Sequence, residues 1–401
     1  MSALHALRAR ATAAQPWLLS AICAVLALKV SWAYALSFLL LAAWLLDGRV
    51  VAKLGAIVRS PLCLAVIASV LIYLLAMAWT ADTAAGWKMV GRQTPLMLFA
   101  LYWSSADPAD RERHVSAFLG GLAVCALLAH YNWLQLHWLT ELPAGIRVVK
   151  SPGDTAPFVD RITYAPLLAL GAYLALRRAL GLTPGARRGA ATLIAALLLA
   201  NLLFSGGRAG LVMFLAMAIG LAFEAFHARR RALLLCAALL PASLFAAYQT
   251  SDYFAQRVDA IGTDLQSFEQ NPNTSVGQRM VYWATSWTVF TEHPLIGVGS
   301  GDFQAEYTRA KPEKWAMTPD SYNPHNQYLM TGVTTGLLGL AALAAIFAFA
   351  ARGGDARSRT VLAGFAVVCL FESYLWRSNT ALAFAVLVAV LTAPSRAGPD
   401  R

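Results

Sequence analysis

The sequence has few charged residues. Only 13% of its 401 positions are Asp, Glu, Lys or Arg, and 58% are hydrophobic. Because a soluble globular protein carries about 25% charged residues, this composition excludes an ordinary soluble domain. Apolar runs recur along the whole chain, and most of them are long enough for a helix that crosses a bilayer. The sequence therefore predicts an all-α polytopic membrane protein that forms a single transmembrane domain over residues 1–401.

Cysteine motifs are also missing. The five cysteines all fall inside apolar stretches and show no Cys-x-x-Cys spacing, so neither a disulfide framework nor a thiolate metal site is predicted. The net charge of +11 would suggest a nucleic-acid partner in a soluble protein. In a membrane protein the topology accounts for most of this charge, and no nucleic-acid partner is expected.

About twelve apolar spans are predicted. The first two are short for a hydrocarbon core of about 30 Å, so they form either a hairpin or one broken element. No internal repeat or low-complexity tract is visible. The spans are 16–30, 33–46, 62–79, 89–104, 115–137, 162–176, 189–205, 209–226, 232–249, 326–350, 360–376 and 379–393.

Basic residues give the orientation, because Lys and Arg are retained on the cytoplasmic side of membrane spans. Nineteen of the 32 basic residues fall on alternate connections, on the side that also carries both ends of the chain. They are Arg8, Arg10, Arg49, Lys53, Arg59, Arg111, Arg113, Arg177, Arg178, Arg187, Arg188, Arg229, Arg230, Arg231, Arg352, Arg357, Arg359, Arg396 and Arg401. We therefore expect both termini in the cytoplasm.

The opposite side carries two substantial segments, about 138–161 and 250–324, and only the second is large enough to fold. It holds nine acidic and five basic residues and begins with one apolar helical stripe, at Phe254, Val258, Ile261, Leu265 and Phe268. A second helix, QRMVYWATSWTVFTEHP, ends at a proline, and the glycines of LIGVGSGDF suit a tight turn. The sequence predicts a large periplasmic helical loop whose first helix lies against the membrane surface.

Basic residues that lie inside spans or on the side opposite the termini suggest a binding site. Arg208 lies in SGGRAG, where a glycine turn lets the backbone approach a ligand and the following helix N-terminus adds positive character. Several arginines on the outer face would grip a diphosphate through bidentate hydrogen bonds. Snorkelling to lipid phosphates is the alternative for each, and an ion pair is the alternative for Arg279. The group is Lys88, Arg92, Arg147, Lys150, Arg161, Arg208, Arg279 and Arg377.

His325, in SYNPHNQYL, stands within about one helical turn of the outer membrane surface. An imidazole titrates near neutral pH and suits removal of a proton from a sugar hydroxyl, with Asn326 and Tyr328 to orient it or the hydroxyl. A purely structural role as a helix cap is the alternative. The other outward histidine, His293, precedes a proline, and the remaining metal-ligand candidates are scattered, so no metal site is predicted.

Three motifs in order carry a family resemblance. SGGRAG after an apolar span, a large outer loop with Arg-x-x-x-Trp and HPLIGVGSGDF, and PHNQYL before the next span cover about residues 205–340. Together they resemble the superfamily of O-antigen ligases and O-antigen polymerases of bacterial inner membranes. The resemblance implies a GT-C-like helical glycosyltransferase that acts on the periplasmic side without a metal. The sequence contains no Asp-x-Asp pair of the kind that holds a divalent ion on a diphosphate.

The resemblance also implies substrates and residue roles. The donor would be a glycan on undecaprenyl diphosphate, the acceptor a sugar of the lipid A-core, and no cofactor is expected. The family's catalytic histidine matches His325, and its turn and loop arginines match Arg208 and Arg279. Arg161 and Lys88 or Arg92 would be supporting donor contacts.

Three other functions compete with a ligase. A polymerase would use similar parts to lengthen a polyprenyl-linked chain. A protein O-oligosaccharyltransferase usually adds a C-terminal domain, whereas this sequence ends at SRAGPDR shortly after its last span. A transporter or flippase for lipid-linked glycans would place its charges near the membrane midplane and would show a repeat of two halves.

Overall fold

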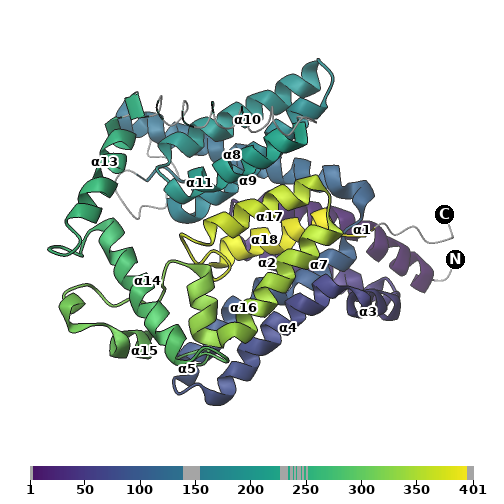
Figure 1. Ribbon diagram of the computed structural model, residues 1–401. Coiled ribbons are helices and arrows are strands. Elements are labelled where there is room, and N and C mark those ends of the chain that lie inside the picture. The colour runs from purple at the N-terminus through teal and green to yellow at the C-terminus, as the bar shows by residue number, and fades with distance from the viewer. Residues whose placement is uncertain are drawn as a thin grey trace.

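The computed structural model describes residues 3–138, 154–225 and 252–394, with isolated positions between 234 and 249. Over these residues the secondary structure is helical and contains no strand, so the predicted all-α class is confirmed. Figure 1 shows the helices packed into one bundle with a group of helices along one side.

The first half of the chain forms the following helices, two of them short 3₁₀ turns: α1 (Ala3–Val25), α2 (Val30–Leu46), α3 (Val50–Arg59), α4 (Pro61–Leu75), η1 (Ala76–Trp79), α5 (Thr83–Arg92), α6 (Thr94–Met97), α7 (Phe99–Ser105), η2 (Pro108–Asp110) and α8 (Arg111–His137). The second half forms α9 (Arg161–Gly181), α10 (Ala186–Phe204), α11 (Arg208–Ala225), α13 (Asp252–Gln266), α14 (Ser275–Glu292), α15 (Phe303–Ala310), η3 (Glu313–Trp315), α16 (Gln327–Gly353), α17 (Ala356–Val368) and α18 (Ser378–Thr392).

Five helices of the described chain are long and apolar enough to cross a membrane: Pro61–Trp79, Pro108–His137, Ala186–Phe204, Arg208–Ala225 and Gln327–Gly353. The pair α2 and α3, bent by 111°, is a sixth candidate. Every predicted span overlaps helical residues, although only isolated positions of 232–249 are among the described residues. The total of twelve spans stays a prediction.

Two predicted spans are interrupted. The span at 89–104 is divided among α5, α6 and α7, where Pro95 stands in the first turn of α6 and cannot continue the helix before it. The span at 360–376 ends early, because α17 stops at Val368 and α18 begins at Ser378. The residues between α17 and α18 form a non-helical connection.

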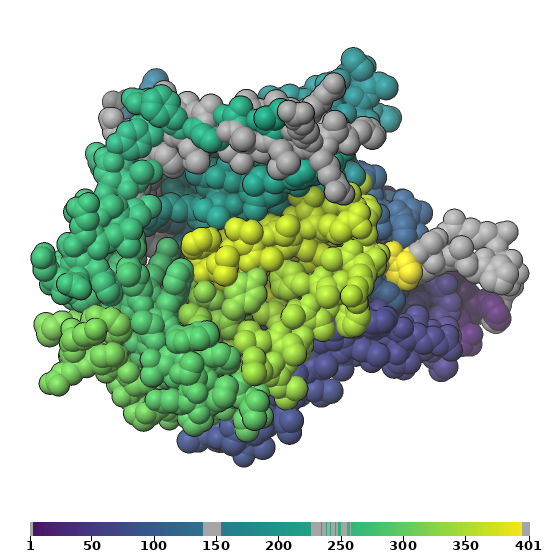
Figure 2. All heavy atoms as spheres, viewed as in Figure 1, coloured from purple at the N-terminus to yellow at the C-terminus, as the bar shows by residue number. Residues whose placement is uncertain are grey.

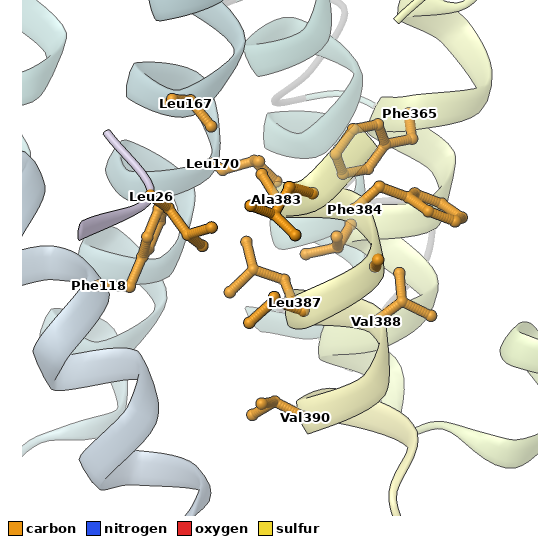
Figure 3. Close-up of a cluster of buried hydrophobic side chains, with 14 of the residues drawn as sticks. Leu26, Phe118, Leu167, Leu170, Phe365, Ala383, Phe384, Leu387, Val388 and Val390 are labelled. Carbon is orange, nitrogen blue, oxygen red and sulfur yellow. The ribbon is translucent and has the colours of Figure 1, made fainter. Parts of the chain in front are cut away.

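The core of the bundle surrounds α18. Every residue of this helix from Thr380 to Thr392 is buried, as expected for a helix that is apolar on all faces. Figure 3 shows Phe384 beside Phe365 of α17, with Leu170 of α9 on another side of the helix, and the two phenylalanine rings meet edge to face at 5.0 Å. The connection that precedes α18 is therefore held by a well-packed helix.

The glycine-rich segment 294–302 runs along α16. The Val298 N–H donates to the Val333 carbonyl at 2.8 Å, next to a kink at Gly336, whose φ is 63°. Asp302 then accepts the backbone N–H groups of Ala81 and Asp82, each at 2.7 Å. The predicted tight turn is thus part of a longer connection that joins the end of α14 to α16 and to the beginning of α5.

The loop 250–324 contains the two predicted helices as α13 and α14. The second begins earlier than expected, at Ser275, because Thr274 caps it by accepting the Gly277 N–H. The apolar stripe of α13 is solvent-exposed at Val258, Ile261 and Leu265; contact of this stripe with a membrane stays a prediction. In the ribbon and space-filling views, α13, α14 and α15 form a lobe along one side, opposite the start of α1 (Figures 1 and 2).

Close helix packing gives a matched test of this fold. A Cβ atom added at Gly121 of α8 would lie 1.8 Å from the carbonyl oxygen of Ala24 in α1, whereas one added at Gly120 meets nothing within 4 Å. We expect Gly121→Ala to destabilise the protein by about 1–3 kcal/mol through overpacking. Gly120→Ala should be neutral or slightly stabilising. Thermal unfolding of both variants in detergent checks this, and equal melting temperatures would contradict the packing of α1 against α8.

Candidate active site

His325 directly precedes the cap of α16. The cap itself is Asn326, whose Oδ1 accepts the N–H groups of Tyr328 at 2.9 Å and Leu329 at 3.1 Å. The structural role considered for His325 is thus filled by its neighbour. His325 has φ 52°, a left-handed conformation that is costly for a residue with a side chain. Among the described residues it is the one non-glycine position with a positive φ.

A hydrogen bond of 2.8 Å joins His325 Nδ1 to Glu372 Oε2. Glu372 lies in the connection between α17 and α18, and its side chain is 2% exposed, whereas that of His325 is 28% exposed. Figure 1 shows α17 and α18 beside α16. This packing brings the connection that carries Glu372 close to His325, which precedes α16. Glu372 is not among the site residues predicted from the sequence. A lone carboxylate inside a predicted membrane span was the available signal, because such residues are costly and are often functional.

Four donors surround the Glu372 carboxylate. Oε2 accepts from His325 and from Arg377 Nη2 at 3.3 Å. Oε1 accepts from Asn323 Nδ2 and from the Ser373 N–H, both at 3.0 Å. Burial opposes ionisation, but the hydrogen bond and charge of His325, the charge of Arg377 and the Ser373 N–H outweigh it and lower the pKa of Glu372 to about 2. The carboxylate is therefore ionised at neutral pH.

Backbone and amide contacts fix the His325–Glu372 pair. The Gln327 N–H donates to the Cys369 carbonyl at 2.8 Å, and Gln327 Oε1 accepts the Leu375 N–H at 2.9 Å. Asn323 Oδ1 accepts the His325 N–H at 2.9 Å. These contacts clamp the beginning of α16 onto the connection that carries Glu372.

Tyr282 of α14 completes the surroundings of the imidazole. Its ring stacks on that of His325, with centroids 5.8 Å apart and an interplanar angle of 23°. One face of the imidazole is therefore covered by an aromatic ring, while the carboxylate of Glu372 holds one edge. The ring orientation is determined by two elements that are far apart in the sequence.

A cavity of about 340 Å³ lies beside Glu372, which is one of its lining residues, whereas His325 is not. Three predicted arginines line it as well, Arg161 from α9, Arg208 from α11 and Arg279 from α14. The structure thus brings together three guanidinium groups that are up to 118 positions apart in the sequence. The cavity is strongly cationic, because Glu372, the one acidic residue among its described lining residues, is already paired with His325 and Arg377.

Three helices begin at the cavity. Arg161 is the first residue of α9, Arg208 is the first of α11 and Ser275 is the first of α14, and all three are lining residues. The N-terminus of a helix carries unpaired N–H groups and the positive end of the helix dipole. Guanidinium groups and helix N-termini together make a site for an anion with several oxygens, such as a diphosphate.

The glycines of SGGRAG place Arg208. A Cβ atom at Gly207 would lie 2.1 Å from the Cβ of Ala165, and one at Gly210 would lie 2.5 Å from the Ala165 backbone. The glycines therefore permit the close packing of α11 on α9, which sets Arg208 beside Arg161. Gly207 also lines the cavity, so the predicted approach of the backbone to a ligand is compatible with this packing.

The contacts of the arginines differ. Arg208 Nη2 donates to Ser275 Oγ at 3.3 Å, which links α11 to the first turn of α14. Arg279 forms no ion pair with a carboxylate in the described part of the chain, so the alternative of a structural ion pair is not supported there. Its guanidinium remains available to a ligand in the cavity.

The other predicted residues lie elsewhere. The guanidinium of Arg92 packs over the Trp376 ring at 3.5 Å. Trp376 directly precedes Arg377, which contacts Glu372. Lys88 is exposed on α5, and neither it nor Arg92 lines the cavity.

Asn326 and Tyr328 also lie outside the cavity lining. Asn326 is the helix cap described above. Tyr328 Oη donates to the Ala366 carbonyl at 2.7 Å, so both side chains have partners within the fold. Arg147 and Lys150 lie outside the described residues. The roles of all these residues in substrate binding stay predictions.

A group of possible metal ligands differs from the expectation that such residues are scattered. Glu292, His293 and Glu306 bring one ligand atom each to within 4.8 Å of one another. Glu306 follows His293 by 13 positions, so no spacing motif showed the group. Arg309 pairs with both carboxylates, at 2.7 Å with Glu306. The arginine thus already balances these charges, and neither His325 nor Glu372 belongs to the group.

These features define a helical membrane protein with a cationic cavity beside a histidine–carboxylate pair. The O-antigen ligase family matches residues 193–344, the segment that contains Arg208, Arg279 and His325. The resemblance inferred from the motifs is confirmed over that segment, whereas Arg161 and Glu372 lie outside it.

The chain is also similar to an uncharacterized protein of Haemophilus influenzae. The two are 33% identical over 92 residues, which is 22% of this chain and 23% of that protein. The chain thus spans less than a quarter of this relative, and the relative adds no assignment of activity.

If the cavity holds the diphosphate, donor binding should depend on the forked shape of the arginine side chains. We expect Arg208→Lys and Arg279→Lys each to weaken binding of undecaprenyl diphosphate about tenfold, or about 1.4 kcal/mol, because lysine loses the bidentate fork. Arg187→Lys is the control, since Arg187 is an exposed arginine in the first turn of α10 and is not a lining residue. Binding is measured with purified protein in detergent. If both cavity variants bind like the control variant, the cavity is not the diphosphate site.

Proposed function

We propose that the protein is an O-antigen ligase. It transfers a glycan from undecaprenyl diphosphate to a sugar hydroxyl of the lipid A-core, with inversion at the anomeric carbon, in the periplasmic leaflet of the bacterial inner membrane. One observation supports this proposal most: Arg161, Arg208 and Arg279 line a cavity that also reaches the partner of His325. Glu372 thus links the cationic cavity to His325, an arrangement that suits glycosyl transfer from a diphosphate.

The arginines act on the leaving group. The bond between C1 of the donor sugar and the diphosphate oxygen breaks in the reaction, and negative charge develops on that oxygen. Fixed guanidinium groups and helix N-termini stabilise such charge more in the transition state than in the ground state. Arg208 and Arg279 hold the diphosphate directly, with Arg161 as a supporting contact.

His325 acts on the acceptor. Its imidazole takes the proton from the acceptor hydroxyl as that oxygen bonds to C1 on the face opposite the diphosphate. The proton ends on His325 and the electron pair of the broken bond on the diphosphate. Because one displacement occurs, the configuration at C1 inverts.

A metal-independent reaction agrees with the lining of the cavity. Glu372 is the one carboxylate among the described lining residues, and its two oxygens already accept four hydrogen bonds. A divalent ion on a diphosphate prefers free carboxylate oxygens. Three arginines supply the positive charge that an ion supplies in other glycosyltransferases.

The periplasmic location rests on the charge distribution. Nineteen basic residues share a side with the termini, and the site lies next to the loop 250–324, which contributes Ser275 and Arg279. Figure 1 shows the helices of that loop opposite the start of α1. With cytoplasmic termini, the loop and the cavity face the periplasm.

The experiment is glycan transfer in a purified system. The protein is incubated with an undecaprenyl-diphosphate-linked glycan and rough lipopolysaccharide, with and without EDTA. We expect transfer in both conditions. Growth of the chain on the polyprenyl carrier would indicate a polymerase, transfer to a protein would indicate an oligosaccharyltransferase, and movement of intact donor across liposomes without transfer would indicate a transporter.

Loss of the proposed base should separate binding from turnover. We expect His325→Ala to accumulate normally, to bind the lipid-linked donor like the wild type and to transfer glycan about 10²–10⁴-fold more slowly. The control is His293→Ala, which removes an exposed histidine at the end of α14. Normal transfer by His325→Ala, or a loss of activity that follows only a loss of folded protein, would contradict the assignment.

A further inference from the structure

We propose that Glu372 is a positioning residue of this site: it keeps the proton of neutral His325 on Nδ1, so that Nε2 is the atom that accepts the proton of the acceptor hydroxyl. This inference rests on the proposed function and concerns a residue outside the segment that the O-antigen ligase family matches.

The hydrogen bonds determine where the protons lie. The Ser373 N–H and the Asn323 amide donate to Oε1, and Arg377 donates to Oε2. A guanidinium and a backbone N–H have no acceptor capacity, so these contacts use the lone pairs of both oxygens and favour the ionised carboxylate, in agreement with the lowered pKa of Glu372. An ionised carboxylate accepts only. His325 Nδ1, at 2.8 Å from Oε2, must then be the donor, and the lone pair of the neutral ring lies on Nε2.

The same contact favours the product of proton transfer. Once Nε2 has taken the proton, the imidazolium is positive and the Glu372 carboxylate lies directly against its other nitrogen. A carboxylate behind a histidine thus fixes the tautomer and stabilises the charged form, as in histidine–carboxylate pairs of hydrolases. The stacked Tyr282 ring and the Asn323 contact to the His325 backbone keep the imidazole from turning.

The location of Glu372 argues for a task other than binding the donor. It is an anion in the lining of a cavity whose other charged residues are Arg161, Arg208 and Arg279, so its charge opposes binding of a diphosphate. Its removal should therefore leave donor affinity unchanged or improve it while turnover falls. A residue that merely stabilises the fold would lower both together.

Within the described residues, Arg377 is the other charged group in direct contact with the pair, because it contacts the same carboxylate oxygen as His325; Arg161, Arg208 and Arg279 share the cavity lining with Glu372. Tyr282 covers a ring face without a charge. Removing the carboxylate leaves Arg377 without its partner and withdraws the charge that favours the protonated imidazole. We therefore expect the acid side of the pH–rate profile to move to lower pH in a variant that lacks this carboxylate.

The test compares Glu372→Gln, Glu372→Asp and the control Glu292→Gln, which removes an exposed carboxylate at the end of α14. An amide cannot accept on both sides, so Glu372→Gln should lower kcat about 10- to 100-fold with donor Kd unchanged or tighter. Its acid limb should move to lower pH. Glu372→Asp keeps the charge and should recover part of the rate if it folds, and the control should behave like the wild type. Full kcat with an unshifted pH profile in Glu372→Gln would overturn the inference.

Two further variants separate this inference from the proposed function. If His325→Ala keeps normal transfer, the proposed base is wrong. If His325→Ala loses transfer while Glu372→Gln keeps it, only the positioning role is wrong. Because Glu372 acts through His325, the double variant should transfer no more slowly than His325→Ala alone. A further decrease would show that Glu372 acts independently and would also overturn the inference.

Discussion

The hydrogen bond between His325 and Glu372 joins the two parts of the chain on which the site depends. It connects the residue before α16 with the residues between α17 and α18, and it is supported by the amide groups of Asn323 and Gln327. The left-handed backbone of His325 is stabilised by these contacts, because an isolated residue in that conformation is strained. Since Glu372 also lines the cationic cavity, the same bond sets the imidazole in relation to the arginines.

The cavity shows how a largely apolar protein concentrates like charges. Three arginines would repel one another in a dry interior, but each stands on or near the first turn of a helix that packs elsewhere through apolar residues. Gly207 and Gly210 let α11 approach α9. The packing of these helices therefore offsets the repulsion between the guanidinium groups. The resulting cluster of positive charge is preorganised, and a bound diphosphate would relieve the repulsion.

Much of this arrangement could be predicted from the sequence. Hydropathy predicts the all-helical class. The distribution of Lys and Arg singles out Arg161, Arg208 and Arg279, because they lie away from the side of the membrane that holds most basic residues. The same distribution also singles out Lys88, which does not line the cavity, because hydropathy and charge counts carry no distances. The breaks at 89–104 and 360–376 were missed because both segments are apolar on average, although Pro95 and Glu372 marked them. Asn326 is a favourable N-cap by residue type, and this role is compatible with its predicted part in orienting His325 or a substrate hydroxyl.

The most direct test is a structure of the His325→Ala variant with an undecaprenyl-diphosphate-linked glycan bound. The diphosphate is predicted to lie within hydrogen-bond distance of the guanidinium groups of Arg208 and Arg279, with Arg161 beside them and the first sugar toward Glu372. A diphosphate bound elsewhere on the protein, with detergent or lipid alone between α9, α11 and α14, would contradict this account.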